Sequence, residues 1–279
     1  MATAPHTAWV VVLRAALRRS NLPVSVIDAM LTTGLDQYAL AFLHKSTYPE
    51  ECDRNYENLE QLGDATANKS IVWYMRNRFP KQSVAVISRL KSKYQGTAMF
   101  AQFADRLGFP DFIKTAPGVP IARMIAEDVF EAFLGATELL ANRHYSTYGV
   151  GGIAVYQIVT SLFNEIAIST DYKDLYDGIT RLKQLAESTL PRGDKFRTVV
   201  GTVTYVTERS RTCGPAGPAG PSGSSGPSGM TSVTVVLTDP AARQHTIGSG
   251  SSHKKAISVE LAAQRALLTL ETWGYDYTG

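Results

Sequence analysis

The sequence predicts two structural parts, an all-α domain followed by a module of order α-β-β-β-α. Up to about residue 169, apolar residues recur at spacings of three and four, which is the period of amphipathic helices. After a polar stretch at 169–174, β-branched residues alternate with polar ones, as they do in half-buried strands. We therefore predict one domain at 1–170 and a second domain at 171–279.

The first domain is predicted to be a set of helices joined by polar or proline-containing loops. Helical periodicity covers residues 38–43, 59–75, 100–107, 121–140 and 153–166. The loops between these segments carry the residues that commonly end helices, at 47–53, 80, 110, 117–120 and 149–152. Because strand-like alternation is absent from this sequence pattern, the prediction is an all-α domain of several helices.

The second domain is predicted to contain three strands between two helices. The helices are expected at 175–190 and 252–272, and the strands at 196–207, 232–238 and 244–247. Between the first two strands, glycine occupies every third position from Gly214 to Gly229, a composition found in collagen. The run is short and both its ends must return to neighbouring strands, so we interpret it as a flexible loop.

Length and composition indicate an intracellular globular protein. The 279 residues, 44% of them hydrophobic, suffice for one large domain or two ordinary ones. No apolar run reaches the roughly 20 residues that cross a bilayer, so no membrane association is expected. Two distant cysteines, Cys52 and Cys213, predict free thiols in a reducing compartment, either the cytoplasm or the nucleus.

Charge is distributed unevenly along the chain. The net charge of +3 is too small by itself to indicate a nucleic-acid-binding protein. Within residues 176–273, however, 11 Lys and Arg stand against 7 Asp and Glu, so the basic excess lies in the C-terminal third. Near the start, Arg14, Arg18 and Arg19 precede the first acid, which weakly resembles a transit peptide. We prefer to interpret this segment as a first amphipathic helix of the fold.

The segment "NYENLEQLGDA" at residues 55–65 places three acids at helical spacing. Glu57, Glu60 and Asp64 are three and four residues apart and therefore share one helical face. Like charges at this spacing destabilise a helix by a few tenths of a kcal/mol. Taken alone, the cluster could be a solvated acidic face. A bound cation is the alternative that would offset the repulsion.

A second segment, "AEDVFEAFLGA" at residues 126–136, carries another acidic pair. Asp128 and Glu131 are three residues apart on a helix that is otherwise largely apolar. Acids are rarely buried without a partner, and a hard cation such as Mg²⁺ prefers oxygen ligands. Two such helices together favour a metal site over a solvated face. We interpret the nearby Arg123 and Glu127 as surface residues.

These two segments, and "LAFLHKSTYPE" at residues 40–50, resemble the motifs of the ribonuclease III family. The resemblance implies that Glu60, Asp64, Asp128 and Glu131 bind Mg²⁺, with Mn²⁺ as a substitute, and that Glu57 is an accessory acid. It also implies hydrolysis of phosphodiesters by two metal ions roughly 3.5–4 Å apart.

One position departs from the family pattern. Gln61 stands where the family usually has phenylalanine, and we expect this change to alter packing rather than chemistry. Lys91 is a candidate phosphate contact, although a solvated helical lysine is the simpler interpretation. The segment "NKSIVWYMRNRFP" at residues 68–80 weakly resembles ribonucleases III of large DNA viruses, for which the compartment would be the host cytoplasm.

The C-terminal segment "HTIGSGSSHKKAISVELAAQRALLTLE" resembles the end of a double-stranded-RNA-binding domain. A Gly/Ser-rich turn is expected before a helix whose start carries His253, Lys254 and Lys255. Basic side chains at a helix N-terminus attract phosphates. The segment "TRLKQLAES" resembles the helix that contacts the minor groove in such domains, which nominates Lys183 and Gln184. The family's Gly-Pro-x-His loop is absent, and the glycine repeat occupies its place.

The resulting prediction is an Mg²⁺-dependent endoribonuclease that cleaves double-stranded RNA, leaving 5′-phosphate and 3′-hydroxyl ends with 3′ overhangs. The resemblance further implies a homodimer formed through the nuclease domain. One alternative is a catalytically silent scaffold or sequestering protein that binds double-stranded RNA with the same fold. Another alternative is a two-metal phosphohydrolase of small nucleotides.

Overall fold

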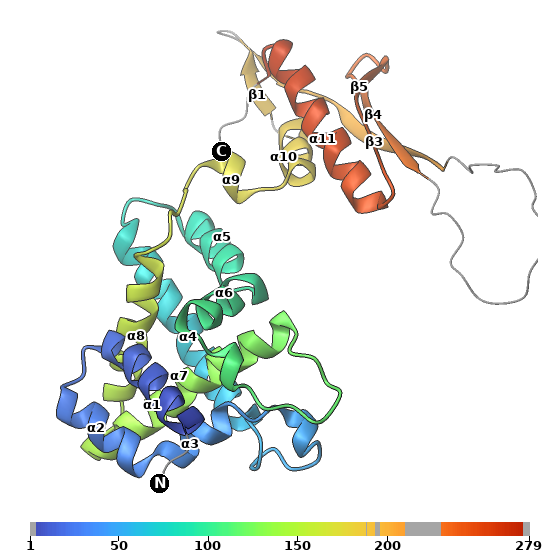
Figure 1. Cartoon of the computed structure of the whole chain (residues 1–279). Coiled ribbons are helices and arrows are strands. Elements are labelled where there is room, and N and C mark those ends of the chain that lie inside the picture. Colours follow the sequence, from blue (N-terminus) through green and yellow to red (C-terminus); the bar gives the residue numbers. More distant parts are fainter. Residues whose placement is uncertain (1–3, 188, 193–195, 210–229, 276–279) are drawn as a thin grey trace, which may run out of the picture. The chain divides into compact units, whose positions relative to one another are not determined.

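The computed structural model describes residues 4–187, 189–192, 196–209 and 230–275. The chain divides into two compact units, Met1–Ile168 and Ser169–Gly279 (Figure 1). The glycine repeat at 214–229 and Cys213 lie outside the described residues.

The first unit is built from helices, which confirms the all-α prediction. The α-helices are α1 (Ala4–Leu17), α2 (Val24–Thr33), α3 (Leu35–Ala41), α4 (Glu57–Arg78), α5 (Val84–Tyr94), α6 (Thr97–Leu107), α7 (Arg123–Tyr145) and α8 (Val150–Phe163). Short 3-10 turns lie at η1 (Arg18–Ser20), η2 (Lys45–Thr47) and η3 (Pro110–Phe112).

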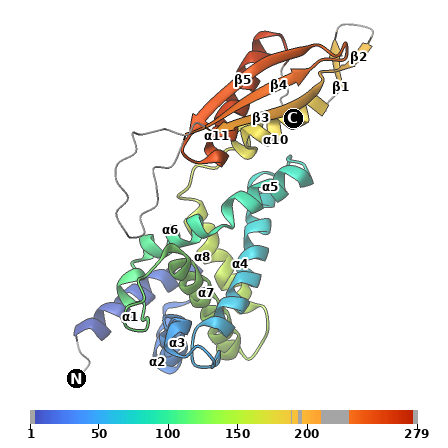
Figure 2. The same cartoon turned by 90° about the vertical axis from the view of Figure 1, so that its right-hand side faces the viewer.

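Helix α7 forms the centre of this unit (Figures 1 and 2). It packs against α2, α3, α4, α6 and α8. Its residues from Val129 to Thr137 are all buried. A helix that is apolar nearly all round belongs inside a protein, and Glu131 lies within this buried stretch.

Two of the three arginines near the start of the chain, Arg14 and Arg19, are paired with acids of the same unit. Arg14 forms an ion pair with Asp28 on α2. Arg19 Nη1 lies 2.7 Å from Glu165 Oε1, beyond the end of α8. These contacts are those of an integral part of the fold, as we expected for this segment. No helix in the described part of the chain is long and apolar enough to cross a membrane.

The second unit confirms the order α-β-β-β-α and adds a hairpin to it. Its elements are α9 (Tyr172–Leu175), α10 (Gly178–Glu187), β1 (Thr189–Arg192), β2 (Phe196–Val199), β3 (Thr202–Arg209), β4 (Thr231–Thr238), β5 (Gln244–Ser252) and α11 (Lys255–Thr272). Strands β3, β4 and β5 form an antiparallel sheet, while β1 and β2 pair separately.

Two predicted elements are each divided in the structure. The strand predicted at 196–207 is interrupted at Gly201, whose positive φ of 143° breaks the extended path. The helix predicted at 175–190 is interrupted before Gly178. There Asp177 Oδ1 accepts a hydrogen bond of 2.7 Å from the Thr180 backbone N–H, which caps the start of α10.

One face of the sheet is covered by α10 and α11 (Figure 2). Buried residues alternate along β4, so Val233, Val235 and Leu237 point to this core. The predicted Gly/Ser turn was wrong, because most of that segment belongs to β5. A Cβ at Gly248 would lie 2.3 Å from the Ala262 carbonyl oxygen, so the glycine allows strand and helix to approach closely.

Candidate metal and active site

Helices α4 and α7 bring acids from the two sequence motifs together. Glu60 on α4 and Asp128 and Glu131 on α7 each offer one carboxylate oxygen, and these three oxygens all lie within 4.8 Å of one another. The residues are up to 71 positions apart in the chain. Their convergence is therefore a product of helix packing.

A pair of glycines explains why the two helices approach so closely. A Cβ built on Gly63 would lie 1.8 Å from the backbone oxygen of Glu131. A Cβ on Gly135 would lie 2.0 Å from the backbone oxygen of Leu59. The backbones of α4 and α7 thus touch at the level of the acids, and any larger residue at either glycine would separate them.

Glu131 is the most buried acid of the cluster, with 7% of its surface exposed. Burial, followed by the charges of Asp64 and Glu127, raises its pKa to about 9. Within the described residues, its carboxylate has no hydrogen-bond or ion-pair partner. Burial and Asp128 raise the pKa of Glu60 to about 7, although Lys45 acts in the opposite direction.

This donor set fits a hard divalent cation. All of its ligands are carboxylate oxygens, which suits Mg²⁺ and Mn²⁺ better than softer metals. The three carboxylates repel one another, and those of Glu60 and Glu131 have no hydrogen-bond or ion-pair partner among the described residues, so a bound cation would stabilise them. Glu60, Asp128 and Glu131 are the residues that would hold such an ion.

Asp64 lies beside this group but is not part of the set of three converging oxygens. It is half-buried on α4, where its Oδ1 accepts a hydrogen bond of 2.7 Å from Asn68 Nδ2. After burial, its charge is the largest influence on the pKa of Glu131. The structure therefore brings three of the four predicted metal ligands together and places the fourth close by.

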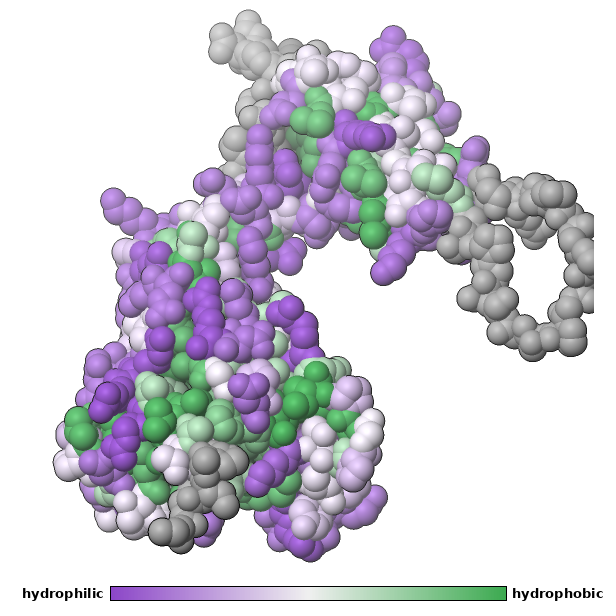
Figure 3. Space-filling view, in the orientation of Figure 1, coloured by the Kyte–Doolittle hydropathy of each residue, from purple (hydrophilic) through white to green (hydrophobic). Residues whose placement is uncertain are grey.

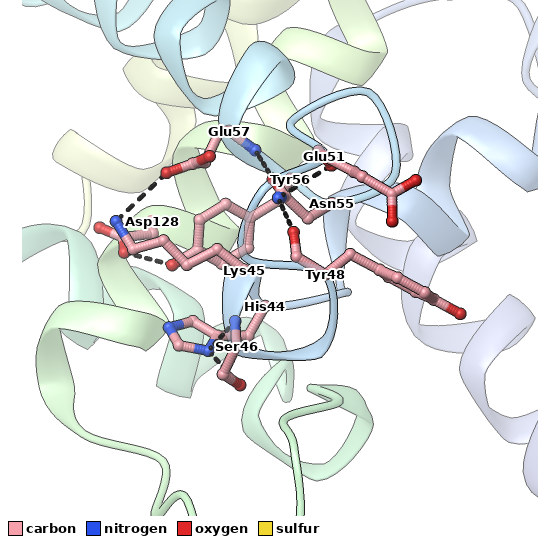
Figure 4. Close-up of polar contacts among 9 residues, drawn as sticks. All are labelled: His44, Lys45, Ser46, Tyr48, Glu51, Asn55, Tyr56, Glu57 and Asp128. Atoms are coloured by element: carbon pink, nitrogen blue, oxygen red, sulfur yellow. Dashed lines mark hydrogen bonds and ion pairs between the residues drawn. The ribbon is translucent and has the colours of Figure 1, made fainter.

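Glu57, the predicted accessory acid, lies at the start of α4 and pairs with a lysine. Lys45 Nζ is 3.3 Å from Glu57 Oε1 (Figure 4). The same ammonium lowers the pKa of Glu60, so Lys45 carries positive charge to the edge of the acidic group. Of the other predicted positions, Gln61 is exposed and Lys91 is half-buried on α5.

Two residues near the acids were missed from the sequence. Glu127, interpreted as a surface residue, is half-buried, and its charge raises the pKa of Glu131. Its position four residues before Glu131 was a signal that could have identified it. Tyr56 donates a hydrogen bond of 2.5 Å from its hydroxyl to Asp128 Oδ2. No spacing rule connects residues so far apart. Arg123 is exposed, as expected.

The residues predicted to contact RNA lie in the second unit. His253, Lys254 and Lys255 are exposed at the N-terminus of α11. On α10, Lys183 is exposed and its Nζ lies 3.9 Å from Glu187 Oε1. Gln184 is half-buried, and its carbonyl oxygen accepts a hydrogen bond from the Tyr172 hydroxyl. The four basic side chains are thus exposed, and Gln184 is the one predicted contact that is half-buried.

The first unit is all-α with acids from two helices at its centre, and the second has the order α-β-β-β-α. This combination is that of a nuclease domain followed by a double-stranded-RNA-binding domain. Residues 57–141 match the family model described as Ribonuclease III domain. The chain is 33% identical over 213 residues to the "Putative ribonuclease 3" of Invertebrate iridescent virus 6, covering 68% of this chain and 69% of that protein. The chain therefore belongs to the ribonuclease III family.

Two further comparisons are similar in kind. The "Putative ribonuclease 3" of Frog virus 3 is 35% identical over 191 residues, which cover 65% of this chain and 50% of that protein. This chain thus spans about half the length of that relative. The nuclease domain of ribonuclease III from Campylobacter jejuni aligns with 51% of this chain and 97% of its own, at 24% identity and a TM-score of 0.41.

The raised pKa values predict how stability without metal depends on pH. In the folded protein the pKa of Glu131 is about 9, above its ordinary value of 4.5. Glu131 therefore contributes most favourably to the free energy of unfolding at low pH, where it is protonated in both states. Stability should therefore fall as pH rises from 5 to 8 in EDTA, because folding then opposes deprotonation. Urea unfolding at several pH values measures this, and Glu131→Gln should flatten the decline. An equal decline in Glu131→Gln would contradict the prediction.

Proposed function

We propose that this chain is a Mg²⁺-dependent endoribonuclease that hydrolyses double-stranded RNA to products with 5′-phosphate and 3′-hydroxyl ends and 3′ overhangs. The observation that carries the proposal is the convergence of Glu60, Asp128 and Glu131 from two helices, in a chain of the ribonuclease III family. We assign catalysis to residues 1–170 and duplex binding to residues 171–279.

Each acid has a role in this proposal. Bound metal ions would supply an activated water and stabilise the leaving 3′ oxygen. Glu60, Asp128 and Glu131 would hold the metal, and Asp64, beside them, would complete the ligand set. Glu57 pairs with Lys45 at the edge of the group, and we assign it the role of an accessory acid beside the scissile strand.

A gel assay on a long, perfect RNA duplex tests this function. Purified protein is incubated with Mg²⁺, with Ca²⁺ or with EDTA. Cleavage to short duplexes only in Mg²⁺ is the expected result. Equal binding in Mg²⁺ and EDTA without cleavage would instead support the silent RNA-binding alternative. Hydrolysis of a small nucleotide that long duplex RNA fails to inhibit would support the phosphohydrolase alternative.

Duplex binding is proposed to use the basic start of α11. Lys254 and Lys255 are exposed there, next to His253, and the N-terminal end of the helix adds partial positive charge. Lys183 and Gln184 on α10 are proposed as minor-groove contacts. For Gln184 this requires sharing its carbonyl oxygen with Tyr172 or presenting its amide nitrogen.

Substituting both lysines by alanine should weaken binding through lost phosphate contacts. The slope of log affinity against log salt should fall by about one for each lysine. Fluorescence anisotropy at several salt concentrations measures this slope. Lys173→Ala is the control, because Lys173 Nζ is paired at 3.2 Å with Glu271 Oε1. A slope unchanged in the double variant would contradict this role.

We also propose that the chain forms a homodimer through the nuclease unit, so that two centres act on one duplex. Apolar residues gather in patches on the face of this unit seen in Figure 3. Helices α4 and α8 border a hollow of about 520 Å³ that is lined in part by Trp73, Ile153 and Tyr156. Trp73 is 56% exposed and Ile153 61% exposed, a degree of exposure that a partner would relieve.

A negative charge introduced at Trp73, which lines this hollow, should weaken the dimer. Trp73→Glu is expected to raise the dimer dissociation constant by about 30-fold or more, since buried interface tryptophans commonly contribute 2 kcal/mol. Analytical ultracentrifugation over a concentration series measures it. Val84→Glu is the matched control, because Val84 is 75% exposed on α5 and does not line the hollow. Equal effects of the two substitutions would contradict this interface.

An intracellular, reducing compartment is proposed as well. It is consistent with Cys52, which is an exposed free thiol.

A further inference from the structure

Tyr56 occupies an unusual place next to the acidic group. Its side chain is completely buried, yet its hydroxyl reaches Asp128 across the interface between the start of α4 and α7 (Figure 4). The hydrogen bond from Tyr56 Oη to Asp128 Oδ2 is 2.5 Å long. Glu60 and Glu131, the other two members of the group, receive no such bond among the described residues.

The ring of Tyr56 is fixed by the segment that precedes α4. The backbone N–H of Tyr56 donates a hydrogen bond of 3.0 Å to the Leu43 carbonyl oxygen. The His44 ring lies edge-on to it, with ring centroids 5.4 Å apart. A completely buried ring that extends from an anchored backbone and has the His44 ring against it has little rotational freedom, so its hydroxyl is directed at one point.

Asn55 secures the same segment from the other side. Its Nδ2 donates to the carbonyls of Tyr48 at 3.0 Å and Glu51 at 3.2 Å. Its Oδ1 accepts from the Glu57 backbone N–H at 2.9 Å, at the start of α4. The loop before α4 is therefore tied to the helix, and Tyr56 moves only if both move.

We propose that Tyr56 is a positioning residue for the metal site, acting through Asp128. The inference rests on the proposed function, because it assumes that Asp128 is a metal ligand. The Tyr56 hydroxyl donates a hydrogen bond to Asp128 Oδ2 and so orients the Asp128 carboxylate. The remaining acceptor positions of Asp128 are then directed toward Glu60 and Glu131 before metal arrives. Groups that orient a ligand in this way commonly change metal affinity by about 10- to 100-fold.

Tyr56→Phe tests this proposal because it removes only the hydroxyl and keeps the buried ring. Mn²⁺ binding to the full chain, measured by electron paramagnetic resonance of the free ion, gives a readout that needs no RNA cleavage. The expected result is a 10- to 100-fold weaker Mn²⁺ affinity in Tyr56→Phe. Affinity within about twofold of the wild type would overturn the inference.

Tyr38→Phe is the matched control. Tyr38 is also completely buried in the first unit, and its hydroxyl lies 3.4 Å from Thr137 Oγ1, outside the acidic group. Its removal should leave Mn²⁺ affinity unchanged. Equal losses in the two variants would overturn the inference. Unfolding of Tyr56→Phe alone would also overturn it, because the hydroxyl would then serve the fold rather than Asp128.

A double-substitution cycle with Asp128→Asn separates an action through Asp128 from a general effect. If Tyr56 acts through Asp128, then Tyr56→Phe should cost little further affinity once Asp128 is replaced. A full additional loss in the Asp128→Asn background would overturn the inference. Absence of Mn²⁺ binding in the wild type is a different outcome: it would overturn the proposed metal site itself, and the inference with it.

Discussion

Glu131→Gln should reduce Mg²⁺-dependent cleavage of a long RNA duplex by at least about 10³-fold while leaving duplex binding unchanged. Glutamine keeps the size of the side chain but removes the negative charge that would hold the metal. Metal stabilisation of a transition state contributes several kcal/mol, and each 1.36 kcal/mol is tenfold in rate. Single-turnover cleavage and anisotropy binding, measured on the same duplex, separate the two effects.

Glu165→Gln is the matched control for this substitution. Glu165 lies in the same unit, is exposed, and its Oε1 accepts a hydrogen bond of 2.7 Å from Arg19 Nη1, outside both the acidic group and the hollow. Its replacement should leave the cleavage rate within a few-fold of the wild type. If Glu131→Gln retained most of its activity, the buried acid would not be a metal ligand and the proposed site would need to be reassigned.

Gly63→Ala should destabilise the first unit by about 3 kcal/mol or more. The added Cβ would meet the backbone oxygen of Glu131 at 1.8 Å, and backbone cannot move away as a flexible side chain can. Inserting one methyl group into a close-packed interior commonly costs 1–3 kcal/mol, and more when helices must separate. Urea unfolding followed by circular dichroism measures the change.

Gly96→Ala is the control for this second prediction. No atom lies within 4 Å of a Cβ built on Gly96, and its φ of −88° suits any residue. That substitution should change stability by less than about 1 kcal/mol. Equal stability of Gly63→Ala and Gly96→Ala would show that α4 and α7 can separate at little cost. The spacing of the acids would then not depend on the glycine contact.

Helical spacing is a local property, so the sequence alone could indicate which acids share a helical face. Glu60, Asp128 and Glu131 each lie on a helix whose apolar period is visible in one stretch of chain. Which of them meet depends on how α4 crosses α7, and that depends on two glycines touching distant backbone atoms. The position of Asp64 beside the group, and the bond from Tyr56, depend on the same crossing.

The second unit shows where local patterns mislead. Glycine and serine at 248–252 are typical of a turn, yet these residues lie in β5. Gly248 and Gly250 occur there because α11 packs too close for larger residues. We predicted a single strand at 196–207, but the positive φ of Gly201 separates β2 from β3. In both places the glycine packs against the backbone of another element, α11 for Gly248 and β4 for Gly201. Sequence pattern alone does not reveal such contacts.

If the proposed cation binds at this site, it competes with protons for Glu131, which is buried without a hydrogen-bond or ion-pair partner among the described residues. With pKa values of about 7 for Glu60 and about 9 for Glu131, the metal-free centre holds protons at neutral pH. Such a cation would bind as those protons leave. Acidification would therefore act as a competitive inhibitor of the metal, and a rise in Mg²⁺ would relieve it without any separate regulatory site.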